Sequence, residues 1–496
     1  MGKFKSLASD TLVYGGSTIL VRLLNWLLMP YYIRTMSEVQ YGIVTQVYGY
    51  IAILLVVLTY GFETSFFRFS NTKNHKNVFT TALTSIGSTS LLFVVFVYLY
   101  KDGLVQFFGK GFSSPLVLMI ALIVAVDAVS AIIFAKLRYQ GKSIRFGLLK
   151  LVNVTLLISL NLYFLYWCPM HLESEYCVVF NGLNIADNQA FYVLLSNLAA
   201  SGIVLLIISS DVFNKLGTLD FRLLLQMYKY SYPILIVGIT GMINIQIDKI
   251  LIPKLIGGEE GLRQLAIYGA NFKIGVLMAM FTQSFRLAFE PFFFKDRRET
   301  ANEALYNDIL KYFVLFGLLI FLGVTFFMDI INIVLTAEYE TGNIVIPIVL
   351  VSQLLSGVYF TLSVWYKITD KTIYGAYMGI VGSIITIGLN ILLIPLLGYV
   401  GAAIAGLVCF LVMVFLSIYW GNKNWALRYK WRSLLTYSAI AGVMYFLAIF
   451  ITPYLSAKVV AINSTGFYIL KYIVRLSLII VFLWLVYYKE FKKKLT

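Results

Sequence analysis

The chain has 496 residues, of which 60% are hydrophobic and only 12% are charged, and its mean hydropathy is +0.85. No soluble fold needs that much apolar surface, so the composition excludes a soluble protein and predicts a polytopic membrane protein. The net charge of +16 would suggest nucleic-acid binding in a soluble chain. In a membrane protein it is better explained by basic loops facing anionic cytoplasmic lipid, so no nucleic-acid partner is expected.

Taken in order, the apolar runs that are long enough to cross a bilayer predict an all-α protein with about fourteen transmembrane helices. They cover residues 11–34, 41–64, 78–100, 115–135, 146–167, 189–209, 230–254, 266–290, 309–328, 343–366, 374–395, 399–420, 433–452 and 466–488. An even number of spans puts both termini on one side. The even-numbered loops and the two tails hold 26 Lys and Arg residues against 6 in the other loops. The positive-inside rule therefore places both termini in the cytoplasm.

The predicted helices fall into two equal blocks. Helices 1–6 form an N-lobe over residues 1–215, helices 7–12 form a C-lobe over residues 216–424, and residues 425–496 add two further helices and a basic tail. The polar segment from Asp211 to Lys229 joins the lobes. Transporters are often built from such repeated halves, with the binding site between them. No loop exceeds about thirty residues, which leaves no soluble domain to hold an active site.

Charged side chains inside the predicted spans are candidates for function, because an intramembrane charge costs several kcal/mol unless it faces protein, water or a partner. The basic set is Arg22, Lys150, Lys249, Lys273, Arg286, Lys471 and Arg475, and the acidic set is Glu63, Asp127, Asp248 and Glu290. Lys150 and Arg286 lie near predicted cytoplasmic ends, where snorkelling explains them. Lys249 lies near the outer end of its span, so it either snorkels with Asp248 as its counter-ion or faces a ligand.

Three stretches together resemble a known family. The first runs from Met29 to Phe69, with a proline closing the first helix and Tyr41-Gly42, Gly61 and Arg68-Phe69 following. The second holds Pro233, Asp248-Lys249, Tyr268-Gly269-Ala270, Lys273 and Glu290-Pro291, and the third runs from Asn390 to Val408. In this order the three stretches resemble the Wzx-type polysaccharide-biosynthesis flippases of the multidrug/oligosaccharidyl-lipid/polysaccharide (MOP) exporter superfamily.

The resemblance implies a two-lobed, MATE/MOP-like inner-membrane transporter with a central cavity. Its substrate would be an undecaprenyl-diphosphate-linked oligosaccharide, a repeat unit of O-antigen lipopolysaccharide, capsule or exopolysaccharide. Alternating access would turn this lipid from the inner to the outer leaflet. The membrane lipids, and the polymerase and chain-length proteins of the same pathway, would be its partners. The sugar itself cannot be read from the residues.

A lipid-linked diphosphate needs cations along its path, preferably arginine, whose fork matches phosphate. Arg22 is central in the first span and is the leading candidate, with Asn25 on the same face to contact sugar hydroxyls. The alternative is a structural Arg22–Asp127 ion pair. Lys273 and Lys249 are the next candidates for substrate binding. Arg475, with Lys471 one turn away, either lines a path for the diphosphate or pairs with headgroups.

Two carboxylates compete for a role in energy coupling. Asp248 either neutralises Lys249 or carries a proton or sodium ion, and Asp127 is the other candidate for that ion. No metal site and no cofactor are expected beyond such H⁺ or Na⁺ coupling. Cys168 and Cys177 share one loop, and whether they form a disulfide stays open. Pro233 is predicted near a helix start, whereas Pro347 is predicted inside a helix, where it would form a hinge.

Rival functions are less consistent with the sequence. A membrane glycosyltransferase or polymerase needs a large outer loop or domain, so the chain is not expected to be an enzyme. The match of Gly141-Lys142-Ser143 to the end of a P-loop fails at the earlier glycine, which is replaced by Lys136. The closer alternative is a cation-coupled multidrug or small-molecule antiporter of the same superfamily. Exporters of organic cations favour acidic walls, and the excess of basic residues inside the spans favours an anionic substrate.

Overall fold

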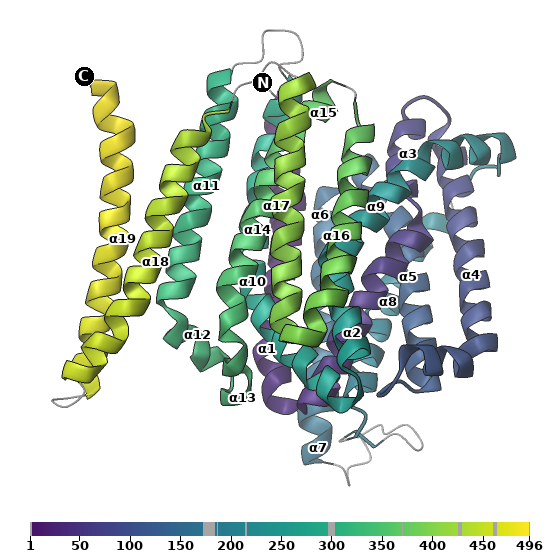
Figure 1. Cartoon of the computed structure of the whole chain (residues 1–496). Helices are drawn as coiled ribbons and strands as arrows, with labels where there is room; N and C mark the ends of the chain where they lie inside the picture. Colours follow the sequence, from purple (N-terminus) through teal and green to yellow (C-terminus); the bar gives the residue numbers. More distant parts are fainter. Residues whose placement is uncertain are drawn as a thin grey trace. The chain divides into compact units, whose positions relative to one another are not determined.

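A computed structural model of the chain describes residues 2–171, 184–185, 187–213, 216–295, 303–369, 371–424, 429–459 and 464–495. Within these ranges all regular secondary structure is helical and no strand occurs, which confirms the all-α class (Figure 1). Cys177 lies outside the described residues, so the pairing of Cys168 with Cys177 stays open. Cys168 itself is buried.

The helices follow the order of the predicted spans. The first part of the chain forms α1 (Gly2–Thr35), α2 (Glu38–Thr59), α3 (Phe62–Ser70), α4 (His75–Phe108), α5 (Ser114–Tyr139), α6 (Ser143–Leu162), the π-helical turn η1 (Tyr163–Trp167), α7 (Cys168–Met170) and α8 (Gln189–Phe213). The second part forms α9 (Phe221–Ile256), α10 (Gly258–Lys295), α11 (Glu303–Phe326), α12 (Met328–Val334), α13 (Ala337–Glu340), the 3₁₀ turn η2 (Thr341–Ile344), α14 (Val345–Leu362), α15 (Val364–Ile368), α16 (Ile373–Leu397), α17 (Tyr399–Asn424), α18 (Trp431–Val459) and α19 (Ser464–Leu495).

Among the described residues, 13 helices or helix pairs are long and apolar enough to cross a membrane. Each of them coincides with one predicted span, from the second to the fourteenth. The remaining predicted span, 11–34, falls within α1, which has 34 residues. The chain is therefore a multi-pass membrane protein with about fourteen spans.

The contacts divide the chain into two compact units. The first unit comprises Met1–Lys273 and Thr372–Cys409, and the second comprises Ile274–Lys371 and Phe410–Thr496. Two of the three division points lie inside a helix, since α10 and α17 each contribute to both units. The lobes at residues 1–215 and 216–424 stay a prediction from the sequence.

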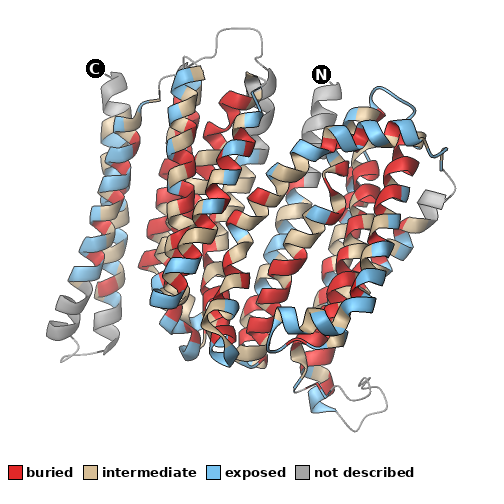
Figure 2. Cartoon of the chain, turned by 45° about the vertical axis from the view of Figure 1, so that its right-hand side comes forward, coloured by how far each residue is buried: buried red, intermediate tan, exposed pale blue. Residues whose placement is uncertain are grey.

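In the first unit, α4 packs along α5, α1 packs along α6, and α9 packs against both α2 and α16. Its core is densest around α5, where 61% of the most apolar stretch is buried. In the second unit, α11 packs against α14 and α18, and α18 packs along α19. Only 11% of the corresponding stretch of α19 is buried. Figure 2 shows α18 and α19 with few buried residues, as expected for helices that face lipid over much of their surface.

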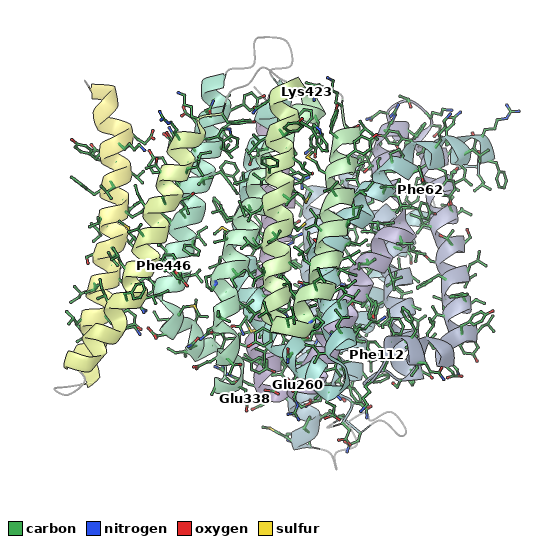
Figure 3. The ribbon with its side chains drawn as sticks, viewed as in Figure 1. Phe62, Phe112, Glu260, Glu338, Lys423 and Phe446 are labelled. Carbon is green, nitrogen blue, oxygen red and sulfur yellow. The ribbon has the colours of Figure 1, made fainter. Side chains whose placement is uncertain are left out.

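The second predicted span is broken in the structure. Tyr60 and Gly61 both adopt left-handed backbone conformations, with φ of 35° and 76°. α2 therefore ends at Thr59, and a new helix, α3, begins at Phe62. A side chain at Gly61 would be strained at that φ, and its Cβ would come within 3.1 Å of Ile234 on α9. The break turns Phe62 into the core, where it is fully buried (Figure 3).

The segment predicted as a polar connector is partly helical. α8 continues to Phe213, and α9 begins at Phe221, where the Asp220 carboxylate accepts hydrogen bonds from the backbone N–H groups of Arg222 and Leu223. A search for continuous apolar runs misses the first residues of α9, because polar residues alternate there with the buried Leu223 and Met227.

One of the two proline predictions is wrong. Pro233 lies more than three turns into α9 rather than near a helix start, because the helix begins earlier than the apolar run. Pro347 lies in the first turn of α14, which follows the 3₁₀ turn η2 directly, so the chain is helical on both sides of it as predicted. A proline inside a helix removes one backbone hydrogen bond and clashes with the preceding turn, so a bend is expected in α9, while a hinge at Pro347 stays a prediction.

Candidate functional site

A lysine among aromatic rings is the central feature of the first unit. Lys273 Nζ of α10 lies 6.0 Å from the ring centre of Tyr32 on α1 and 5.7 Å from that of Tyr41 on α2. The indole N–H of Trp26 on α1 donates to the backbone carbonyl of Lys273 at 2.8 Å. Three helices thus hold one cation against the faces of Tyr and beside Trp. Among the described side chains, no carboxylate lies within ion-pairing distance of Lys273.

The approach of α2 to α10 depends on two small residues. A Cβ added at Gly42 would meet the carbonyl oxygen of Leu262 at 2.2 Å, and one added at Gly269 would meet Thr45 at 2.8 Å. The backbones can therefore come together only because both positions are glycine. This contact fixes Tyr41 of α2 beside Lys273 of α10. Tyr41-Gly42 and Tyr268-Gly269 belong to two of the three stretches that carry the family resemblance.

Lys249 of α9 lies close to this group but has partners of its own. Its Nζ is 3.1 Å from Asp248 Oδ1, 2.8 Å from the carbonyl oxygen of Ile245 and 4.0 Å from the centre of the Phe272 ring. The hydroxyl of Tyr268 donates to the other oxygen of Asp248. The carboxylate and the ammonium group are both buried, so the pair is internally neutralised. The geometry corresponds to the role of Asp248 as counter-ion to Lys249.

Arg22 and Asn25 lie on α1 close to the residues that contact Lys273. Arg22 is one helical turn before Trp26, and Asn25 is adjacent to Trp26. Both Arg22 and Asn25 are exposed. The structure therefore brings Arg22, Asn25 and Lys273 into one neighbourhood of the first unit, linked by the hydrogen bond from Trp26 to the Lys273 carbonyl. Trp26 was missed by the sequence reasoning, which searched the spans for charge and not for aromatic partners.

Asp127 of α5 belongs to a polar cluster formed by four helices. It makes a side-chain hydrogen bond with Ser201 of α8 and lies in the electrostatic field of Lys150 from α6. Tyr48 of α2 also interacts electrostatically with Asp127, and the side-chain amide of Asn197 on α8 donates a hydrogen bond to the Tyr48 hydroxyl at 2.9 Å. Lys150 contacts the Phe134 ring at 4.3 Å inside the unit, which gives it protein partners in place of the headgroups expected for a snorkelling lysine.

Arg475 lies in the second unit, within a three-membered ion cluster. Asp329 Oδ2 on α12 is 2.8 Å from Lys471 Nζ and 3.2 Å from Arg475 NH1, both on α19. Arg475 also donates to the carbonyl of Phe326 at the end of α11. The sequence analysis paired Lys471 with Arg475 but missed Asp329, which stands one residue beyond its predicted span. An acidic residue directly after a long apolar run was the signal that could have found it.

The fold defines the class. Over 96% of this chain and 99% of the other, the structure superposes on the lipid II flippase MurJ in an inward closed conformation, with a TM-score of 0.74 at 14% identity. An inward-facing multidrug-resistance MATE-family transporter of the MOP superfamily matches over 81% of this chain and 94% of its own, with a TM-score of 0.60 at 14% identity. A MOP-superfamily transporter from Pyrococcus furiosus, reported with a binding pocket of reverse polarity, matches over 84% of this chain and 95% of its own, with a TM-score of 0.57 at 13% identity. The chain thus has the fold of MOP-superfamily transporters and flippases.

The family follows from the sequence comparison. The family of polysaccharide biosynthesis proteins matches residues 7–295, more than half of the chain, and the chain belongs to this family. No curated protein matches the sequence. The predicted resemblance to a polysaccharide-biosynthesis family is thereby confirmed.

Proposed function

We propose that the protein is a flippase that moves an undecaprenyl-diphosphate-linked oligosaccharide from the inner to the outer leaflet of the cytoplasmic membrane by alternating access. Membership of a polysaccharide-biosynthesis family supports a glycan substrate. One of the solved structures that share the fold is a flippase of a lipid, lipid II. In this proposal both termini lie in the cytoplasm, and the polymerase and chain-length proteins of the pathway receive the product.

The observation that carries the proposal is the aromatic environment of Lys273. A cation held against tyrosine faces without a described carboxylate partner is costly unless it serves a ligand. An ammonium group provides a strong point charge for phosphate. The buried rings of Tyr32 and Tyr41 hold this group, and the half-buried indole of Trp26 provides a face on which a sugar ring can stack. Lys273 with Tyr32, Tyr41 and Trp26 therefore matches the two ends of a sugar diphosphate better than an organic cation, which an antiporter would export.

The experiment compares Lys273→Gln with Lys273→Arg in a strain whose own flippase gene is deleted. Surface polysaccharide is quantified together with the amount of protein in the membrane. We expect Lys273→Gln to reduce export at least about tenfold, the effect of losing about 1.4 kcal/mol of substrate interaction, while Lys273→Arg retains part of the activity because the charge remains.

The matched control is Lys110→Gln, which removes one cation from an exposed position of the first unit outside this neighbourhood. It should export at the level of the unmodified protein. If Lys273→Gln exported normally at normal protein levels, Lys273 would have no part in substrate binding. Arg22→Ala and Asn25→Ala extend the same comparison to α1.

For energy coupling we propose Asp127 in place of Asp248, because the Asp248 carboxylate is already occupied by Lys249 and Tyr268. Asp127 makes a side-chain hydrogen bond with Ser201 and lies in the electrostatic field of Lys150 and Tyr48, so its carboxylate can take up a proton or a sodium ion. Purified protein in liposomes, with undecaprenyl diphosphate as substrate, should show transport that responds to an imposed pH or sodium gradient. Asp127→Asn should remove this response, whereas Asp102→Asn on an exposed part of α4 should leave it. A response that persisted in Asp127→Asn would exclude Asp127 from coupling.

A further inference from the structure

The start of α9 exposes a stripe of large apolar side chains. Phe221, Leu225, Tyr228 and Tyr232 follow one another at intervals of three and four residues, so they share one face of the helix. Leu225 is 71% exposed and Phe221 is 69% exposed. The opposite face is fixed to the unit through buried Leu223 and Met227. A stripe this exposed at the end of a membrane helix is typical of a segment that lies at the lipid interface.

Basic side chains border this stripe. Arg222 and Lys229 are both exposed and, being seven residues apart, lie on one side of the helix. Between them Gln226 accepts a hydrogen bond from Lys73 Nζ at 3.1 Å, which adds a third cation from the turn before α4. Asp220 is the acidic residue nearest in sequence, and its carboxylate caps the helix. The border is therefore net positive.

A cavity of about 360 Å³ opens beside the same stripe, between α2, α4 and α9 of the first unit. Its wall is formed by Val57, Leu58, Tyr60, Thr89, Tyr228, Ser231, Tyr232 and Leu235. The cavity lies at the break between α2 and α3, where the ring centres of Phe62 and Tyr228 are 4.9 Å apart. Phe62 is labelled in Figure 3. Tyr228 and Tyr232 belong to both the stripe and the cavity, so the two features are continuous.

The hydroxyl groups around the cavity are engaged with one another. Tyr60 and Tyr228 share Ser85 at 2.7 and 2.8 Å. Ser231 bonds Ser65 at 2.6 Å, and Thr89 donates to backbone carbonyls within α4. The surface presented to the cavity is consequently almost all carbon. A sugar would leave its own hydroxyls unsatisfied there, whereas a hydrocarbon chain would not.

We propose that this cavity and the basic border of α9 form one binding site for an anionic phospholipid of the bilayer. An acyl chain occupies the cavity, and the phosphate-bearing headgroup lies against Arg222, Lys229 and Lys73. The charge selects anionic over zwitterionic lipid, since each basic residue near an anionic membrane surface contributes on the order of a fivefold preference. Basic pockets between transmembrane helices are known to take such headgroups. The site is separate from Lys273 and does not depend on the proposed flippase function.

The test uses purified full-length protein and measures lipid binding by native mass spectrometry. The lipids are phosphatidylglycerol and phosphatidylethanolamine with matched acyl chains. Arg222→Gln/Lys229→Gln should weaken phosphatidylglycerol binding on the order of twenty-five-fold and leave phosphatidylethanolamine binding unchanged. The control variant Lys423→Gln/Arg432→Gln removes two exposed cations from the second unit, Lys423 being labelled in Figure 3, and should bind both lipids as the unmodified protein does.

Phosphatidylglycerol with a photoreactive group in its acyl chain tests the cavity itself. Crosslinks should fall on the peptides that contain residues 57–60 and 228–235, and Val57→Trp, which fills the cavity from its open side, should abolish them. Equal loss of phosphatidylglycerol binding in the control variant, or crosslinks elsewhere only, would overturn the proposal. So would displacement of phosphatidylglycerol by undecaprenyl diphosphate, since the site would then belong to the transported lipid. Export by Arg222→Gln/Lys229→Gln is measured in parallel, so that an error in this site is distinguished from an error in the function.

Discussion

Lys249 and Lys273 lie on neighbouring helices of one unit, yet the protein accommodates their charges in different ways. Lys249 has a carboxylate from the preceding residue, a backbone carbonyl and the face of Phe272. Lys273 has the faces of Tyr32 and Tyr41. A buried pair with complete hydrogen bonding is a structural arrangement. A cation beside rings retains its charge for a ligand. The same residue type inside the membrane can therefore serve the fold at one position and the substrate at another.

The largest expected effect tests the structural half of this comparison. Asp248→Asn leaves Lys249 as an uncompensated buried cation, because Tyr268 and Ile245 cannot neutralise it. We expect the free energy of unfolding in detergent to fall by about 3–5 kcal/mol. Asp248→Asn/Lys249→Met should recover most of that loss, since removing both charges removes the unpaired one. Chemical unfolding followed by circular dichroism measures both variants.

Lys273→Met provides the contrast for this measurement. Because no described carboxylate pairs with Lys273, the Lys273→Met variant should have an unfolding midpoint equal to or above that of the unmodified protein, while its export activity falls. An unchanged unfolding midpoint in Asp248→Asn would show that the Asp248–Lys249 pair is not structural. Lys249 would then again be a candidate for substrate binding.

The sequence predicted the fold well because membrane helices follow from hydrophobicity and length alone. Every apolar run of sufficient length coincides with a helix, and the family stretches identified the polysaccharide-biosynthesis family. Helix ends were predicted less well where a helix is amphipathic, as at the start of α9, since an apolar window cannot see a helix with one polar face. The place of Pro233 was wrong for the same reason.

The candidate site was predicted only in part, because charge can be read from a sequence but partners cannot. Lys273 and Lys249 were both selected as cations inside the spans. Asp248 was offered from sequence as a counter-ion of Lys249, whereas nothing in the sequence showed that Lys273 faces two tyrosines. Trp26 and Asp329 were missed because their roles arise from contacts between residues more than 140 positions apart. The glycines that bring α2 to α10 were quoted as family residues, and their physical role became clear only from the close backbone approach.

The smallest expected effect comes from removing the hydroxyl of Tyr268. This change removes one hydrogen bond to Asp248 and leaves the charge of Asp248 in place. Tyr268→Phe keeps the shape of a fully buried ring and removes one donor to a carboxylate that keeps its lysine. A hydrogen bond to a charged group contributes about 1.5–3 kcal/mol, and a neutral one about 0.5–1.5 kcal/mol. The expected loss is therefore about 2 kcal/mol, less than for Asp248→Asn. Tyr60→Phe, which removes a neutral bond to Ser85, is the matched control and should lose about 1 kcal/mol. If the two variants lost the same amount, the Tyr268 bond would not be strengthened by the charge of Asp248.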